Sequence, residues 1–167
     1  MSVNLLELAP HCEIIPAGPF LMGTPDTERS GLAKRFGGTR ESYADESPQH
    51  EVDLPGFAMM RTPVTNQLYD QWVRAAGGRR PMAWRGGELP PELGDHPVVD
   101  VSWEDAVSFA RWLSAATGLH WQLPTEAQWE KGARGVDGRQ FPWGNTFDPS
   151  RCNAREAGHA GTTPVGA

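Results

Sequence analysis

Glycine and proline interrupt this sequence so often that long regular elements have room to form in only a few places. The 167 residues include 19 glycines and 15 prolines, about a fifth of the chain. Proline breaks helix interiors and glycine weakens them, so the pattern argues against a helical bundle. Seven tryptophans argue against disorder, because disordered chains are poor in large apolar side chains. The pattern therefore predicts a loop-rich globular α+β fold.

Three stretches between these interruptions have the pattern of an amphipathic helix. The first begins after Thr65 as N-cap and ends at Gly77-Gly78. The second begins after Ser102, with Asp105 in the place of a capping-box partner, and ends at Gly118. Its apolar stripe consists of Ala106, Phe109, Ala110 and Leu113. The third begins after Thr125 and ends at Gly135, with Gln128 completing a T-x-x-Q box. We expect about three helices.

Other stretches have strand character. Residues 13–23 predict a hairpin, because two apolar runs flank a turn with proline and glycine, and residues 50–62 repeat this pattern. Residues 96–102 predict a buried strand. Residues 24–49 show no period and predict a long surface loop, and residues 77–97 predict a second connection. Without an internal repeat or a linker, a single domain over 1–167 is expected.

Charge and hydropathy limit the partners. The net charge is −6, the pI is near 5.3, and no run of basic residues exceeds the pair Arg79-Arg80, so we expect no nucleic-acid partner. No apolar stretch is long enough to span a bilayer, so we expect no membrane partner. The first 18 residues lack the basic start of a signal peptide, which predicts a cytoplasmic protein.

The residues alone indicate no catalytic site. Cys12 and Cys152 are too few for a disulfide framework, and free buried thiols are the favoured interpretation over a metal or redox role. Whether they meet in space stays open. The acidic pairs in the first turns of helices are explained by the helix dipole. Tryptophans at helical spacing are typical of core packing, and Trp103 and Trp112 are the candidates for a second interface.

The order of the segments is more informative than any segment alone. Six segments follow one another along the chain: IPAGPFLMG, VSWEDAVSFARWL, LPTEAQWEKGARG, FPWGNTF, CNARE and GTTPVGA. This order resembles the sulfatase-modifying factor family, the family of the formylglycine-generating enzyme, over residues 13–167. The resemblance implies a C-type-lectin-like α+β fold that is low in regular secondary structure.

The resemblance also implies a range of functions. The family's oxidases bind copper through two cysteines and use oxygen to convert a sulfatase cysteine into formylglycine. Related domains occur in ergothioneine-forming sulfoxide synthases, beside an iron-binding helical domain. Others are non-catalytic modules that bind protein or peptide ligands. The family's oxidases further suggest calcium as a structural ion, held by the Asn153 side chain and the Ala154 carbonyl; the alternative is that Asn153 only supports a turn.

The copper site is not carried over to any residue of this sequence. In the family, the copper-binding cysteines follow the TPV run, whereas Cys12 and Cys152 both precede it. We therefore expect no catalytic and no cofactor-binding residue here, and a domain truncated at its C-terminal end. The expected function is that of a formylglycine-generating-enzyme-like domain that is inactive alone; the alternative is a protein- or peptide-binding module. A second chain that completes the fold is a further expected partner.

Overall fold

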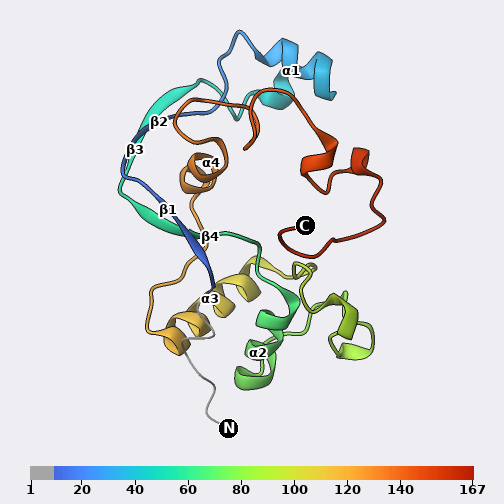
Figure 1. The fold of residues 1–167 in the computed structure, drawn as a ribbon. Helices are drawn as coiled ribbons and strands as arrows, with labels where there is room; N and C mark the ends of the chain where they lie inside the picture. Colours follow the sequence, from blue (N-terminus) through green and yellow to red (C-terminus); the bar gives the residue numbers. More distant parts are fainter. Residues whose placement is uncertain (1–9) are drawn as a thin grey trace. The chain divides into compact units, whose positions relative to one another are not determined.

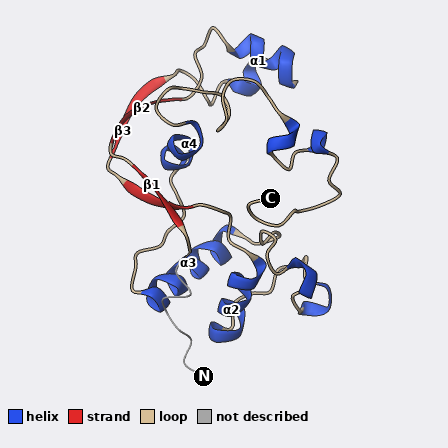
Figure 2. Cartoon of the chain, viewed as in Figure 1, coloured by secondary structure: helices blue, strands red, loops and turns tan. Residues whose placement is uncertain are grey.

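The computed structural model describes residues 10–167, which form four α-helices, four short strands and five 3-10 turns (Figures 1 and 2). The first nine residues, which are half of the stretch considered as a signal peptide, lie outside the described part. In chain order the elements are β1 (Cys12–Ile15), β2 (Gly18–Met22), α1 (Arg29–Phe36), η1 (Glu41–Tyr43), β3 (His50–Leu54), β4 (Phe57–Met60), α2 (Asn66–Ala76), η2 (Arg85–Gly87), η3 (Pro91–Leu93), α3 (Trp103–Thr117), α4 (Glu126–Arg134), η4 (Pro149–Arg151) and η5 (Arg155–Ala157).

The chain forms two compact units, each built from segments that are distant in sequence. Unit 1 contains Met60–Leu123, Asp148–Ala167 and the described residues before 14. Unit 2 contains Ile14–Met59 and Pro124–Phe147. The single domain expected over 1–167 stays a prediction.

Helices α2 and α3 carry the core of unit 1, and both begin and end where the sequence predicts. The Thr65 hydroxyl accepts from the Leu68 N–H at 3.2 Å, and Ser102 and Asp105 form a reciprocal capping box. Gly118 ends α3 in the left-handed conformation. The buried cluster between the helices consists of Tyr69, Trp72, Val73, Trp84, Phe109 and Leu113. The predicted apolar stripe of α3 is confirmed at Phe109, Ala110 and Leu113, which are buried.

Asn66 is a buried polar residue at the start of α2, and it holds two loops against this core. Its amide nitrogen donates to the carbonyls of Leu93 at 2.9 Å and His96 at 3.2 Å. Its amide oxygen accepts from the Trp84 indole N–H at 2.9 Å. Asn66 is only 4% exposed, so each of these bonds satisfies a group that water does not reach.

The strands form two two-stranded sheets, β1 with β4 and β2 with β3. The predicted hairpin over 13–23 is therefore wrong: β1 and β2 both form, but neither pairs with the other. Strand β2 runs antiparallel to β3, with Gly18 opposite Leu54. The proline-containing stretches expected as hairpin turns, at Pro16 and at Pro55, instead interrupt the strands, because proline has no N–H to donate to a strand partner. A Cβ on Gly56 would lie 3.3 Å from the Ala17 nitrogen, so the two segments come close there.

Unit 2 contains a helix that the sequence pattern does not predict. Helix α1 lies within residues 24–49, where we expected a surface loop, so the number of helices is four rather than three. The side chain of α1 that is buried is polar rather than apolar. The Arg29 guanidinium is buried and donates to the Asp26 carboxylate at 3.0 Å and to the Arg40 carbonyl at 3.0 and 3.2 Å.

Helix α4 is confirmed, with the predicted capping box between Thr125 and Gln128. It presents Lys131 to the interior of unit 2, where this side chain is 2% exposed. The Lys131 amine donates to the carbonyls of Pro16 at 2.9 Å and Gly18 at 2.7 Å. The lysine therefore fastens α4 to the interruption between β1 and β2.

The buried strand predicted over 96–102 does not form. Pro97 makes an isolated bridge with Thr65, and Val98 donates to the Val64 carbonyl at 2.9 Å, but Val99 is 41% exposed. Asp100 has a φ of 58°, in the left-handed region, which ends any extended run. The segment is a loop whose role is to lead into α3.

Candidate functional site

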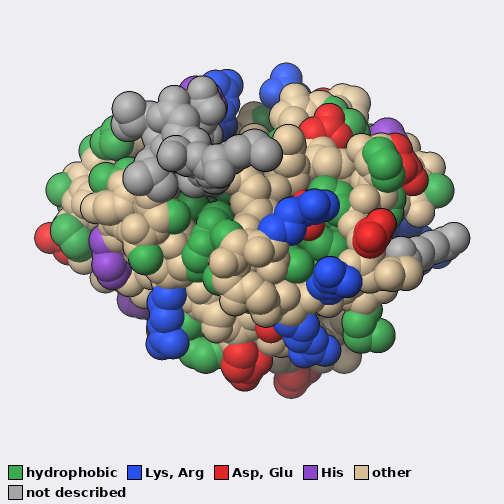
Figure 3. Space-filling model, turned by 90° about the horizontal axis from the view of Figure 1, so that it is seen from below, with side chains coloured by type: hydrophobic (Ala, Val, Ile, Leu, Met, Phe, Trp, Pro, Cys, Tyr) green, Lys and Arg blue, Asp and Glu red, His purple; other side chains and the backbone are tan. Residues whose placement is uncertain are grey.

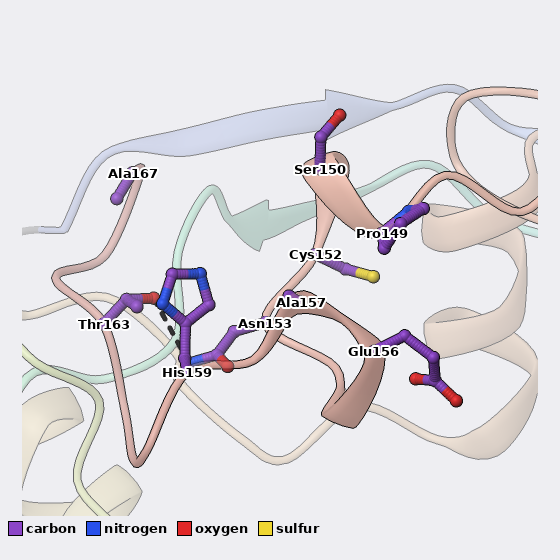
Figure 4. Close-up of a pocket in the computed structure, with 9 residues that line it drawn as sticks. All are labelled: Pro149, Ser150, Cys152, Asn153, Glu156, Ala157, His159, Thr163 and Ala167. Atoms are coloured by element: carbon purple, nitrogen blue, oxygen red, sulfur yellow. Dashed lines mark hydrogen bonds between the residues drawn. The ribbon is translucent and has the colours of Figure 1, made fainter.

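The pocket that holds the predicted calcium ligand lies in unit 1, between η4, η5 and the last residues of the sequence. It has a volume of about 430 Å³. Figure 4 shows its lining, which consists of Pro149, Ser150, Cys152, Asn153, Glu156, Ala157, His159, Thr163 and Ala167.

The contacts of Asn153 and Ala154 are those of a folded turn. The Asn153 amide nitrogen donates to the Gly161 carbonyl at 2.8 Å and to the Thr163 hydroxyl at 3.4 Å, the bond dashed in Figure 4. The Ala154 carbonyl accepts from the Ala157 N–H at 2.9 Å. These two residues thus offer one amide oxygen and one already bonded carbonyl, whereas calcium takes six to eight oxygen ligands. Asn153 and Ala154 alone do not make up a calcium site.

Both cysteines are free and half-buried. The Cys12 thiol donates to the Pro10 carbonyl at 3.5 Å, and burial raises its pKa above the usual value, which lowers its nucleophilic thiolate fraction. Cys152 shares its pocket with His159 and Glu156, but the Glu156 carboxylate and the His159 ring extend in different directions (Figure 4). Among residues 10–167, no three His, Cys, Asp or Glu side chains are gathered as metal ligands.

A larger cleft lies in unit 2, and sequence reasoning did not find it. It has a volume of about 1020 Å³ and is bounded by the end of β2, by α1, by residues 43–50, by α4 and by residues 137–145. We call it the unit 2 cleft. Its large apolar and aromatic lining residues are Leu21, Met22, Leu32, Phe36, Tyr43, Trp129 and Phe141. Because these come from separate segments of the sequence, no contiguous motif marks them.

A polar network holds the floor of this cleft. The Glu130 carboxylate accepts from the Gly23 N–H at 2.8 Å and forms an ion pair with Arg134. The Arg134 guanidinium also donates to the carbonyls of Gly23 at 3.2 Å, Gly138 at 3.0 Å and Arg139 at 2.7 Å. The end of β2 and the turn after α4 are thereby tied to one helix face.

Aromatic contacts join α1 to the residues that follow α4. The Phe36 ring at the end of α1 meets Phe141 edge-on at 6.3 Å, and Phe141 stacks on Trp143 at 5.4 Å. The Arg35 guanidinium lies 5.0 Å from the centre of the Phe36 ring and donates to Gln140 at 3.2 Å. Helix α1 and residues 139–147 therefore form one packed wall.

The loop-rich α+β arrangement and the comparisons agree on the family. The model of the "Sulfatase-modifying factor enzyme 1-like domain" matches residues 4–167. The chain belongs to the sulfatase-modifying factor family. A solved structure, that of PvdO from Pseudomonas aeruginosa, superimposes on all of this chain and on 66% of its own, with a TM-score of 0.71 and 27% identity. The expected C-type-lectin-like α+β fold is thus confirmed.

The relatives carry more than one activity in their names. Formylglycine-generating enzymes from Thermomonospora curvata and Streptomyces coelicolor are 37% and 40% identical over 76% and 80% of this chain. A hercynine oxygenase from Mycolicibacterium smegmatis is 30% identical over 92% of it. The chain spans 44%, 42% and 39% of these proteins, respectively, which is less than half of each.

The surface and the helices add two observations. Figure 3 shows both basic and acidic side chains at the surface of the described residues. No helix within the described residues has the length and apolar character needed to cross a bilayer.

Proposed function

We propose that residues 10–167 form a formylglycine-generating-enzyme-like domain that does not itself carry out copper-dependent oxidation. The observation that carries this proposal is the state of the cysteines. Copper(I) selects soft thiolate ligands, and the family's oxidases use two of them. Here Cys12 and Cys152 lie in β1 and after η4, each with only a backbone carbonyl as hydrogen-bond acceptor. Oxidation by the whole protein would depend on residues outside this sequence.

The relatives that match this chain include enzymes of different classes. Formylglycine-generating enzymes, a hercynine oxygenase and a serine/threonine-protein kinase from Chlamydia trachomatis all match this chain. Since function depends on a site rather than on a fold, membership of the family does not assign an oxidation to these residues.

Oxygen consumption tests this proposal. The 167-residue chain is mixed with copper and a peptide that contains one cysteine, and oxygen is followed with an electrode. We expect no uptake above a protein-free control, and the same rate for the Cys12→Ser and Cys152→Ser variants. Uptake that is lost in either variant would show that the chain has a working thiol site.

A second candidate function is a non-catalytic module that binds a protein segment. It is favoured by the unit 2 cleft, whose lining includes the exposed side chains of Leu21, Phe36 and Trp129. Exposed apolar side chains that share one concave surface are typical of binding sites.

Calcium remains a proposal for the pocket around Asn153, with ligands beyond Asn153 and Ala154 required. Isothermal titration of the chelator-treated chain with calcium tests it. Binding that disappears in Asn153→Ala supports the site, and an unchanged isotherm in this variant refutes the assignment of Asn153.

A further inference from the structure

The unit 2 cleft combines exposed apolar side chains with an excess of acidic groups. Trp129 on α4 is 64% exposed, Phe36 on α1 is 48% exposed, and Leu21 on β2 is 43% exposed. Single exposed apolar residues are normal on a protein surface, but these line the same cleft. The volume of about 1020 Å³ is at the upper end of that of pockets that hold drug-sized ligands, so it suits several side chains rather than one ion.

The acidic side chains of the lining outnumber its basic ones. The carboxylates are those of Glu28, Asp45, Glu46, Glu126, Glu130 and Asp137. Among the residues that the structure describes, Arg134 is the one arginine or lysine in this lining, and its guanidinium is already bonded to Glu130 and to backbone carbonyls. Asp137 is also paired, with Arg139 at 2.8 Å, and this contact lowers the pKa of Asp137. The remaining carboxylates make the cleft complementary to a cation.

We infer that the unit 2 cleft binds a basic segment of a partner protein, with arginine or lysine next to apolar residues. This inference rests on the second proposed function, the binding module, and gives it a place and a ligand. The apolar residues of the segment would cover Leu21 and Phe36. Its basic side chain would lie on Trp129, because the face of a tryptophan ring attracts a cation.

The spacing on α4 supports this arrangement. Glu126 and Trp129 are separated by one helical turn, so a guanidinium over the indole is within reach of a carboxylate. Helix α1 shows a cation–π contact within the protein, since the Arg35 guanidinium already lies over the Phe36 ring. An arginine in the partner would therefore meet an aromatic face and an acid together.

A metal ion fits the cleft less well. Of the carboxylates, Glu130 is engaged by Arg134 and Gly23, and Glu46 accepts from the Thr24 hydroxyl at 3.2 Å. The described residues gather no group of three acidic, histidine or cysteine side chains as metal ligands. A metal ion would also make no contact with the apolar and aromatic side chains that line the cleft.

Fluorescence anisotropy with two labelled peptides tests the inference. Both are blocked six-residue peptides: one alternates arginine with leucine, and the other has glutamine in place of arginine. We expect the arginine peptide to bind and the glutamine peptide to bind at least about tenfold more weakly, the difference expected for the lost cation–π and charge contacts. Raising the ionic strength from about 0.05 to 0.5 M should weaken the arginine peptide, because salt screens exposed charges.

The chain offers matched controls for both kinds of contact. Trp103 on α3 is 68% exposed, and Glu104 lies in the first turn of α3 as Glu126 does in α4; neither lines the cleft. Trp129→Ala should weaken the arginine peptide about twofold to fivefold, the range of a cation–π contact at an exposed site. Glu126→Gln should weaken it about twofold to fivefold, as for a rim charge. Trp103→Ala and Glu104→Gln should leave its affinity unchanged.

The outcomes separate the inference from the proposal beneath it. Equal binding of both peptides, weakened by Trp129→Ala, would overturn the basic ligand and keep a binding module. Equal weakening by Trp103→Ala and Trp129→Ala would overturn the assignment to the cleft. Binding of neither peptide would overturn both. Far-ultraviolet circular dichroism of each variant checks folding, and the exposed Glu126→Gln variant tests the same site should Trp129→Ala unfold.

Discussion

The interiors of the two units are built in different ways. Unit 1 buries an aromatic and aliphatic cluster between α2 and α3, with one neutral amide, Asn66, at its edge. Among the described residues, unit 2 contributes only Phe20 to the buried apolar set. Its interior is organised instead by the side chains of Arg29, Lys131 and Arg134, which donate to backbone carbonyls.

The difference shows two ways of satisfying a loop-rich chain. Loops bring many backbone carbonyls toward the interior, and each needs a donor where water is excluded. In unit 1 the helices provide a hydrophobic core and Asn66 satisfies the few loop carbonyls that reach it. In unit 2 Phe20 is the one fully buried apolar side chain among the described residues, and long basic side chains supply several donors each. We therefore expect the stability of unit 1 to depend on packing around the Asn66 amide, and that of unit 2 to depend on its basic residues.

The largest expected effect is at Asn66. Asn66→Ala removes the donor to the Leu93 and His96 carbonyls and the acceptor of the Trp84 indole, in a position that is 4% exposed. Leaving several buried groups unpaired should lower the free energy of unfolding by about 3 kcal/mol or more. Denaturant unfolding followed by tryptophan fluorescence measures it.

Asn153→Ala is the matched control for this variant. Asn153 also donates to a backbone carbonyl, that of Gly161, but it is exposed, so water can replace the bond. In the presence of a calcium chelator the loss should stay below about 1 kcal/mol. Similar losses in both variants would contradict the role of Asn66 as the buried support of unit 1.

The next effect is at Lys131 and tests unit 2. Lys131→Met keeps a long side chain but leaves the carbonyls of Pro16 and Gly18 without their donor. We expect a loss of about 2–3 kcal/mol in the free energy of unfolding, with hydrogen exchange accelerated in α4 and β2 before it changes in α2.

Lys34→Met on the exposed face of α1 is the control and should change the free energy of unfolding by less than about 0.5 kcal/mol. Buried ionic groups are sometimes replaced by apolar ones with a gain in stability. Such a gain in Lys131→Met would break the comparison, because unit 2 would then prefer an apolar interior as well.

The contrast between the units also explains how much of the fold the sequence predicts. Helices α2, α3 and α4 are found from their caps and apolar faces, since Thr65, Ser102 and Thr125 act through contacts within a few residues. Helix α1 is missed because Arg29 holds it through the distant Arg40 carbonyl. The strands are found but mispaired, because nothing local distinguishes the turn at Pro16 from an interruption.

The candidate sites also differ in whether they depend on local or long-range contacts. The sequence locates Asn153 and Ala154 by resemblance, and their pocket is built largely from neighbouring residues. The unit 2 cleft brings α1 against residues 139–147 and places both beside α4, so its lining depends on long-range packing. Trp112, a candidate for a second interface, packs on the core, with its ring centre 5.8 Å from that of Phe109, whereas Trp103 is exposed. Exposure of a tryptophan on a helix is decided by tertiary contacts.

The smallest expected effect is a dependence of stability on pH that arises from Tyr69, in the core of unit 1. Burial, followed by the nearby charge of Asp105, raises the pKa of Tyr69 to about 12, although the charge of Arg79 opposes this shift. Above pH 10 the unfolded chain releases the phenolic proton while the folded chain keeps it. The folded state then binds more protons, so stability is fully present below pH 10 and falls as the pH rises toward 12, by at most about 1.4 kcal/mol per pH unit.

Tyr69→Phe removes this titration together with the hydrogen bond from the phenol to the Arg79 carbonyl. The variant should therefore be less stable by about 1 kcal/mol at neutral pH, the usual cost of one such bond, yet lose less stability between pH 10 and 12. Urea unfolding at a series of pH values gives the free energy of unfolding of both proteins as a function of pH. The difference between the two free energies should narrow between pH 10 and 12. Parallel curves would mean that the Tyr69 phenol ionises as easily in the folded chain as in the unfolded one. The apolar core of unit 1 would then not disfavour a charged phenolate. In that case unit 1 would not differ from unit 2, with its buried basic side chains, in how well its interior accepts a charge.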